Sequence, residues 1–189
     1  MFYSSSSFEI VKKIETQWQR IQEEYRGLDP TILDVHRNGS HTDYFAKIND
    51  KNGWVPSWKV GSTEKNFQWL TYAVCMNGEF PGDTEERLPF TVALLKECPQ
   101  LTVCAFSNMK GLSMIPPHSH PELGGNILTF HLGIDIPKPG GFLWVNGVFE
   151  AESEGKSLVF DGSLPHFAIN VSDADRVVMY MEFDRSRSA

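Results

Sequence analysis

The chain has 189 residues, of which 41% are hydrophobic and 22% are charged, and its formal net charge is −7. A single domain of this length can bury enough apolar surface to fold without disulfides or a structural metal. The acidic balance leaves no basic surface for a phosphate backbone, so we expect no nucleic-acid partner.

The sequence also lacks the usual signals for membranes and for disulfides. No apolar run approaches the roughly 18 residues of a membrane span, and the N-terminal residues resemble no signal peptide. Cys75, Cys98 and Cys104 are odd in number and have no C-x-x-C spacing. We therefore expect a cytoplasmic protein with buried, reduced thiols and no membrane partner.

The N-terminal half is predicted to be helical and loop-rich. Apolar residues recur at helical spacing over residues 8–25, which predicts one amphipathic helix. Residues 26–66 are rich in turn-forming residues and predict mostly loop, with His36 and His41 exposed there. A strand over 67–74 and a short helix over 88–98 follow.

From residue 101 onward the apolar pattern has period two, which predicts a series of short strands. These strands cover residues 101–107, 126–136, 142–145, 157–160, 167–171 and 176–183. Asn146-Gly147 predicts a tight hairpin between two of them. Helices followed by many closely spaced strands predict a mainly β fold, a sandwich or jelly roll with a helical flank.

Two of these strands assign polar residues to a definite face. In 126–136, His131 alternates with the apolar residues and must point away from the main apolar face. In 176–183, Arg176 lies on the face opposite Val177 and Met179. A buried arginine needs an anionic partner, such as the carboxylate of a co-substrate. The alternative is an exposed Arg176 beside Asp175.

The histidines point to a metal site. His118, His120 and His131 lie close together in sequence, and His166 lies in a later predicted strand. Imidazole is the commonest transition-metal ligand and suits Fe(II). His120-Pro121-Glu122 followed by a distant histidine also fits a site with two histidines and one carboxylate. Spacing alone therefore leaves open whether His118 or His120 joins His166.

Several short blocks of the chain occur in a recognisable order. They are Leu94-Leu95-Lys96-Glu97-Cys98-Pro99, Ser107-x-Met109, Pro117-His118, His131-Leu132-Gly133, Gly155-Lys156, Phe160-Asp161-x-Ser163-x-x-His166 and Arg176. This order resembles the aspartyl/asparaginyl β-hydroxylase family of Fe(II)- and 2-oxoglutarate-dependent oxygenases. The resemblance implies a mainly β, cupin-like double-stranded β-helix with flanking N-terminal helices. It would form one oxygenase domain over 1–189, with helices and loops in 1–100 and the jelly-roll core in 101–185.

The resemblance also implies an activity, hydroxylation of an unactivated C–H bond with O2, and a role for each matching residue. His118 and His166 would bind the iron without a carboxylate. Arg176 and Ser107 would hold the far carboxylate of 2-oxoglutarate, and His131 and the Met109 backbone would lie at its metal-binding end. His120 and Glu122 receive no role.

The substrate of the resembling enzymes is not carried over. Where family members present basic side chains to an acidic substrate, this chain has Ala105, Ile127 and Thr129. We therefore expect a small molecule, an amino acid derivative or a peptidyl residue as substrate. Two alternatives stay open: a metal-dependent cupin enzyme, because Asp161 and His166 resemble part of the second cupin motif, and a non-catalytic cupin-like binding module.

Overall fold

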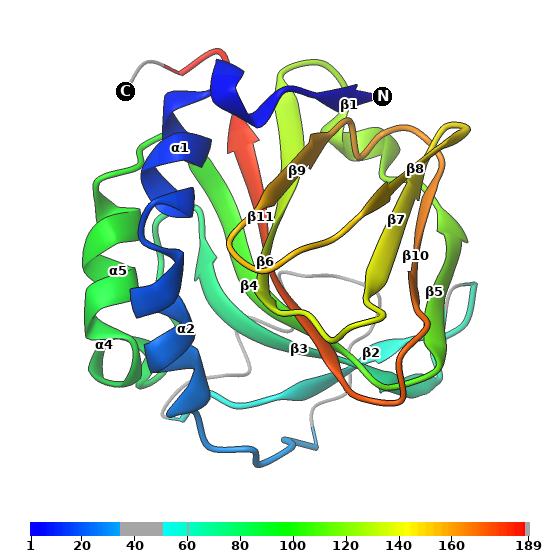
Figure 1. Ribbon diagram of the computed structural model, residues 1–189. Helices are drawn as coiled ribbons and strands as arrows, with labels where there is room; N and C mark the ends of the chain where they lie inside the picture. Colours follow the sequence, from blue (N-terminus) through cyan, green and yellow to red (C-terminus); the bar gives the residue numbers. More distant parts are fainter. Residues whose placement is uncertain (35–50, 60, 188–189) are drawn as a thin grey trace.

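The computed structural model describes residues 1–34, 51–59 and 61–187, and His36 and His41 lie outside these ranges. Two antiparallel sheets face each other, and the long helices cover the outer side of the larger sheet (Figure 1). The larger sheet has the order β1 (Phe2–Tyr3), β9 (Ser157–Phe160), β6 (Ile127–Asp135), β11 (Arg176–Asp184), β4 (Leu101–Met109), β3 (Lys65–Met76) and β2 (Val55–Trp58). The smaller sheet has the order β5 (Ser113–His118), β10 (His166–Asn170), β7 (Gly141–Val145) and β8 (Val148–Ala151).

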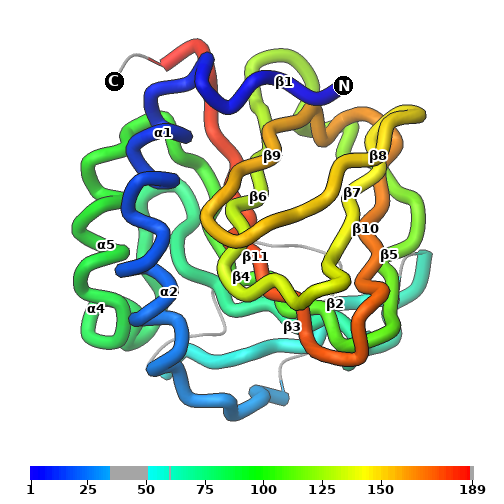
Figure 2. Tube along the Cα trace, viewed as in Figure 1, coloured from blue at the N-terminus to red at the C-terminus, as the bar shows by residue number. Residues whose placement is uncertain are grey.

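The eight strands β4 to β11 form a double-stranded β-helix. Strands β4, β6, β9 and β11 belong to the larger sheet, and β5, β7, β8 and β10 belong to the smaller one. The chain thus passes repeatedly from one sheet to the other, as its trace shows (Figure 2). The predicted fold class, a mainly β jelly roll with helices at the N-terminal side, is confirmed.

The sequence prediction omitted strands β1, β5 and β8, and it placed β2 in a stretch expected to be mostly loop. Strand β5 contains Pro116 and Pro117, which cannot donate a backbone hydrogen bond, and it lies at the edge of the smaller sheet where proline is tolerated. The predicted hairpin at Asn146-Gly147 joins β7 to β8, with Val145 opposite Val148. Both turn residues have positive φ, 44° at Asn146 and 96° at Gly147, as this turn requires.

The helices are η1 (Ser5–Ser7), α1 (Glu9–Glu15), α2 (Trp18–Arg26), α4 (Thr84–Arg87), α5 (Pro89–Lys96) and η2 (Pro121–Leu123). The single helix predicted over 8–25 is wrong, because the helix ends at Glu15 and a new one begins at Trp18. Thr16 Oγ1 donates to the carbonyl of Lys13 at 2.9 Å, a local bond that competes with helix propagation. The break also lets Trp18 pack directly on Gly155. None of the helices in the described ranges is long and apolar enough to cross a membrane.

The main core lies between the helices and the larger sheet. Ile14 and Ile21 from the helices are fully buried against Phe130 of β6 and Met179 of β11. Each such side chain contributes about 1.5–3 kcal/mol by leaving water. The predicted faces of β6 and β11 are confirmed, since their alternate residues fill this core. The opposite face of the larger sheet therefore turns toward the smaller sheet, and it carries the polar residues.

Gly133 of β6 holds the segment after β8 close to the larger sheet. Its N–H donates to the carbonyl of Lys156 at 3.0 Å, and its own carbonyl accepts from the N–H of Gly155 at 2.9 Å. A Cβ at Gly133 would lie 2.7 Å from the Ser153 carbonyl carbon, a backbone atom that cannot rotate away. This position therefore excludes any side chain.

We expect the Gly133→Ala substitution to destabilise the protein by about 1–3 kcal/mol, because the segment around Ser153 must move away from β6. Urea unfolding monitored by tryptophan fluorescence measures the change. Gly27→Ala is the control: Gly27 has an ordinary φ of −83° and a Cβ there meets its nearest atom at 3.4 Å. The control should change stability by less than about 0.5 kcal/mol. Equal losses in both variants would contradict the close approach.

Candidate metal centre

Strand pairing brings two of the predicted ligands together. Strands β5 and β10 are antiparallel neighbours, and His118 lies directly opposite His166 in their register. The centroids of these two rings are 4.3 Å apart. The residues are distant in sequence, but the connection through the other strands of the jelly roll returns the chain to the same edge.

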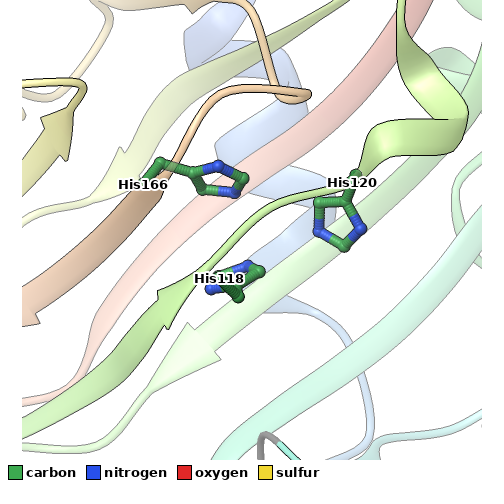
Figure 3. A group of neighbouring side chains, drawn as sticks. All are labelled: His118, His120 and His166. Atoms are coloured by element: carbon green, nitrogen blue, oxygen red, sulfur yellow. The ribbon is translucent and has the colours of Figure 1, made fainter.

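A third histidine joins them. His120 follows the end of β5 and precedes η2, and its N–H donates to the carbonyl of Gly162 at 3.0 Å. Its ring centroid lies 5.1 Å from that of His118 and 5.5 Å from that of His166. The three side chains face a common space (Figure 3). The sequence left His120 without a role, and the structure brings it to the two predicted ligands.

The spacing of the ring nitrogens suits a metal ion. One ligand nitrogen from each of the three histidines lies within 4.8 Å of the other two. Nitrogens on one metal lie within about 4 Å of each other, because each metal–nitrogen bond is about 2.1 Å long. A small inward movement of the rings therefore forms a site with three imidazole ligands on one side and open positions on the other.

Each ring also has an acceptor for its second nitrogen. Nδ1 of His118 lies 2.7 Å from the carbonyl of Pro116, and Nδ1 of His166 lies 2.8 Å from the carbonyl of Leu164. When Nδ1–H donates to these carbonyls, the Nε2 lone pair is free for a metal. Nδ1 of His120 lies 3.2 Å from Oε1 of Glu122. The carboxylate of Glu122 can thus accept a hydrogen bond from Nδ1 of His120.

Burial keeps two of the rings neutral. It lowers the pKa of His166 to about 3 and lowers the pKa of His118 as well, because a charged imidazolium loses its hydration there. The hydrogen bonds to the Leu164 and Pro116 carbonyls oppose the shift without reversing it. Both rings therefore present unprotonated ligands at neutral pH.

A pocket between the two sheets opens beside this cluster. His118, His120 and His166 lie in its wall together with two other predicted site residues, Ser107 and His131. The rest of the lining is mostly apolar and includes Trp58, Trp69, Ala73, Cys75, Val103, Cys104, Ala105, Ile115, Leu143 and Ala168. No Asp, Glu, Lys or Arg contributes to this wall in the part of the chain that the structure describes.

Neighbouring groups determine the hydrogen bonding of Ser107 and the protonation of two cysteines in the pocket wall. Ser107 Oγ accepts a hydrogen bond from Trp69 Nε1 at 3.0 Å and keeps its own proton for a ligand. Burial raises the pKa of both the Cys75 and the Cys104 thiol. The described cysteines are all reduced and buried, as the sequence predicts.

Arg176 does not lie in the pocket wall but behind it. Its side chain is completely buried, so the exposed alternative beside Asp175 is wrong. Met109 lies opposite Arg176 in the register of β4 and β11 and is also fully buried. The Met109 carbonyl accepts from Asn170 Nδ2 at 3.3 Å.

The partner of Arg176 is Glu152, which the sequence reasoning missed. Arg176 Nε donates to Oε2 of Glu152 at 2.6 Å, and Nη2 donates to Oε1. Nδ1 of His131 lies 3.1 Å from the same Oε1. The sequence did predict that a buried arginine needs an anionic partner. Glu152 lies in a segment without periodicity, however, so it could not be identified as the partner of Arg176.

Charges in this group compensate one another. Burial alone would raise the pKa of Glu152, but the Arg176 charge and the hydrogen bonds from His131 and Arg176 lower it to about 2. Burial lowers the pKa of His131, and the Arg176 charge acts in the same direction against the Glu152 hydrogen bond. The result is a neutral His131 beside a buried ion pair.

The ion pair should make stability depend on acid. Because the folded-state pKa of Glu152 is below its usual 4.5, its contribution is present above that pH and is lost as pH falls toward 2. The loss should be about 3 kcal/mol, measured by urea unfolding between pH 5 and pH 2. The control is the double variant Glu152→Leu plus Arg176→Met, which replaces the pair by apolar groups. An equal acid-induced loss in the control would contradict this assignment.

The sequence is similar to several known proteins. A family model described as "Aspartyl/Asparaginyl beta-hydroxylase" matches residues 15–186. An "Ornithine lipid ester-linked acyl 2-hydroxylase" from Rhizobium tropici is 31% identical over 127 residues, 66% of this chain and 44% of that protein. The "Aspartyl/asparaginyl beta-hydroxylase" of Homo sapiens is 26% identical over 179 residues, 92% of this chain and 21% of that protein. This chain therefore spans less than half the length of either relative.

Solved structures with a similar arrangement of strands include the "predicted oxalate decarboxylase" from Thermotoga maritima, with a TM-score of 0.46 and 11% identity over 74% of this chain and 96% of that chain. KdgF from Halomonas sp. has a TM-score of 0.42 and 12% identity over 68% of this chain and 94% of that chain. The family model, in contrast, covers almost the entire sequence, and both relatives named above are hydroxylases. The resemblance expected from the sequence is confirmed, and the chain belongs to the aspartyl/asparaginyl beta-hydroxylase family.

Proposed function

We propose that this protein is an Fe(II)-dependent hydroxylase that uses O2 and a 2-oxo acid to hydroxylate an unactivated C–H bond. The observation that carries the proposal is the cluster of His118, His120 and His166 at a pocket, in a chain of a hydroxylase family. Imidazole ligands suit Fe(II), and three ligands on one side leave positions for O2 and a co-substrate.

The residues around the cluster have supporting roles in this proposal. The Pro116 and Leu164 carbonyls orient the rings of His118 and His166, so that their free nitrogens point to one place. The apolar wall keeps water away from the reacting bond. When bound, Fe(II) and the 2-oxo acid supply the oxidation, in which R–H, O2 and the 2-oxo acid give R–OH, CO2 and the shortened acid.

The family resemblance implies 2-oxoglutarate as the 2-oxo acid, and the residues fit it in part. His131 lines the pocket beside the histidines, as expected for the metal-binding end, and Ser107, expected at the far carboxylate, also lines the pocket and keeps a proton to donate. Arg176 carries the positive charge that a second carboxylate would need. That charge is paired with Glu152 in this structure, so it is not available to a far carboxylate.

The substrate group that enters the pocket is proposed to be apolar. Ala105 lines the pocket where family members place a basic side chain, and the described lining contains no Asp, Glu, Lys or Arg. An acidic side chain would lose its hydration there without gaining a partner. The Rhizobium tropici relative is named for hydroxylation of an acyl group, and a hydrocarbon chain of that kind suits such a wall.

The metal site can be tested by anaerobic titration with Fe(II) in a calorimeter. Alanine at His118, His120 or His166 should weaken binding by more than the roughly tenfold to hundredfold lost when only a ligand's outer partner is removed. Met114→Ala is the control, because this residue is exposed on the same strand as His118. Wild-type affinity for His120→Ala would reduce the site to two histidines, and wild-type affinity for His118→Ala plus His166→Ala would refute it.

Turnover tests the reaction. With Fe(II), a 2-oxo acid and a substrate panel, O2 uptake should produce CO2 and hydroxylated product in equal amounts. The panel should contain pairs that differ only in a carboxylate on the group presented to the pocket. We expect at least a roughly tenfold preference in kcat/KM for the uncharged member, because a charge in this wall is desolvated. The Ala105→Arg variant should prefer the uncharged member less strongly than the wild type does. A wild-type preference for the acidic member would contradict the assignment of an apolar substrate group.

A metal-dependent cupin enzyme that needs no 2-oxo acid is the second candidate. The third histidine and the internal partner of Arg176 both favour it, because neither is required to hold 2-oxoglutarate. It predicts turnover with metal and substrate alone. A reaction that stops when the 2-oxo acid is omitted would exclude this candidate.

A further inference from the structure

Arg176 already holds a carboxylate that belongs to the chain itself. Nε and Nη2 of Arg176 donate to the two oxygens of Glu152, an arrangement of two parallel hydrogen bonds. An arginine binds an external carboxylate in the same manner. Both side chains are buried, with 0% of Arg176 and 2% of Glu152 exposed, so solvent does not weaken the pair. One full edge of the guanidinium is therefore occupied.

The backbone fixes Glu152 in this place. Its N–H donates to the carbonyl of Gly141 at 2.9 Å, so the residue is tied to the start of β7. A Cβ at Gly141 would lie 3.3 Å from Arg176 Nε and would overlap the Glu152 carboxylate, so β7 packs directly on the ion pair. Two residues later, Glu154 bridges to Gly133 of β6. Contacts with both β7 and β6 therefore fix the backbone position of Glu152 next to Arg176.

The charge that remains for a ligand is close to zero. The positive charge of Arg176 and the negative charge of Glu152 cancel, and Arg176 contributes nothing to the pocket wall. Its Nη1 is buried and has no hydrogen-bond partner among the described residues. A second carboxylate here would add an uncompensated buried charge. A neutral oxygen acceptor could satisfy Nη1 without that cost.

We infer that Glu152 takes the place of the far carboxylate of 2-oxoglutarate on Arg176, so that the site does not select a 2-oxo acid with a second carboxylate. This inference rests on the proposed use of a 2-oxo acid. The co-substrate class is then 2-oxo acids in general, bound through the metal-binding end beside His131. A neutral tail is accepted at least as well as a charged one.

The test compares two ligands with the same five-carbon chain, 2-oxoglutarate and 2-oxopentanoate, which differ only in the far carboxylate. Their affinities for the metal-loaded protein are measured anaerobically by calorimetry, together with the shift that each causes in the melting temperature. The wild type should bind 2-oxoglutarate no more than about threefold more tightly than 2-oxopentanoate. Glu152→Gln leaves Arg176 charged and unpaired, so it should prefer 2-oxoglutarate by roughly tenfold to a hundredfold. It should also melt at a lower temperature than the wild type, and 2-oxoglutarate should restore more of that loss than 2-oxopentanoate.

The double variant Glu152→Leu plus Arg176→Met is the matched control, because it removes both charges and should show no preference for 2-oxoglutarate. If Glu152→Gln does not fold, the wild-type ratio decides alone. A wild-type preference of tenfold or more for 2-oxoglutarate, lost in Glu152→Gln, would overturn the inference and make Glu152 a positioning residue for Arg176. Binding of Fe(II) but of neither 2-oxo acid by any variant would instead overturn the proposed function.

Discussion

The register of β10 is the constraint on which the candidate metal centre depends. This strand lies between β5 and β7, so His166 faces His118 on one side and Val145 on the other. Side chains alternate along a strand, and a slip by one residue would turn His166 to the opposite face. The backbone hydrogen bonds of two neighbouring strands thus hold the ligand pair together before any metal binds.

The space between the sheets has to satisfy two opposing requirements. The proposed chemistry needs a dry pocket, and the apolar lining around Ala105 and Leu143 provides it. A dry pocket penalises charge, yet Arg176 is buried behind it. Glu152 compensates the charge of Arg176 without a ligand. His131 contacts Glu152 and also lines the pocket, so it connects the ion pair to the pocket wall. The site therefore combines the neutral imidazoles of His118, His131 and His166 with one compensated ion pair.

Features that depend on local periodicity could be predicted from the sequence. Alternation alone assigns His131 and Arg176 to the face opposite the main apolar one, and the structure confirms this face because Val177 and Met179 fill the core on the other side. The jelly roll follows from the number and spacing of the strands. The family resemblance selected His118 over His120, whereas the structure places both rings beside His166.

Features that depend on tertiary contacts could not be predicted. The helix break at Thr16 accompanies the packing of Trp18 on Gly155, which is distant in sequence. Strand β5 was not predicted because its two prolines argue against a strand, except at the edge of a sheet. The sequence does not show that this segment lies at an edge. Glu152 belongs to a connecting segment, so no pattern could show that it reaches Arg176. In each case the missing information is which distant segment lies nearby.

The thiols of Cys75 and Cys104 bear on how long such a catalyst survives. Oxidants react with the thiolate rather than with the protonated thiol. Both side chains line the pocket, and burial raises the pKa of each, so they remain protonated at neutral pH. The proposed hydroxylation would activate O2 next to these two thiols. Sulfur in this wall can thus provide close packing while resisting the sulfenic and sulfinic acids that would otherwise accumulate over many turnovers.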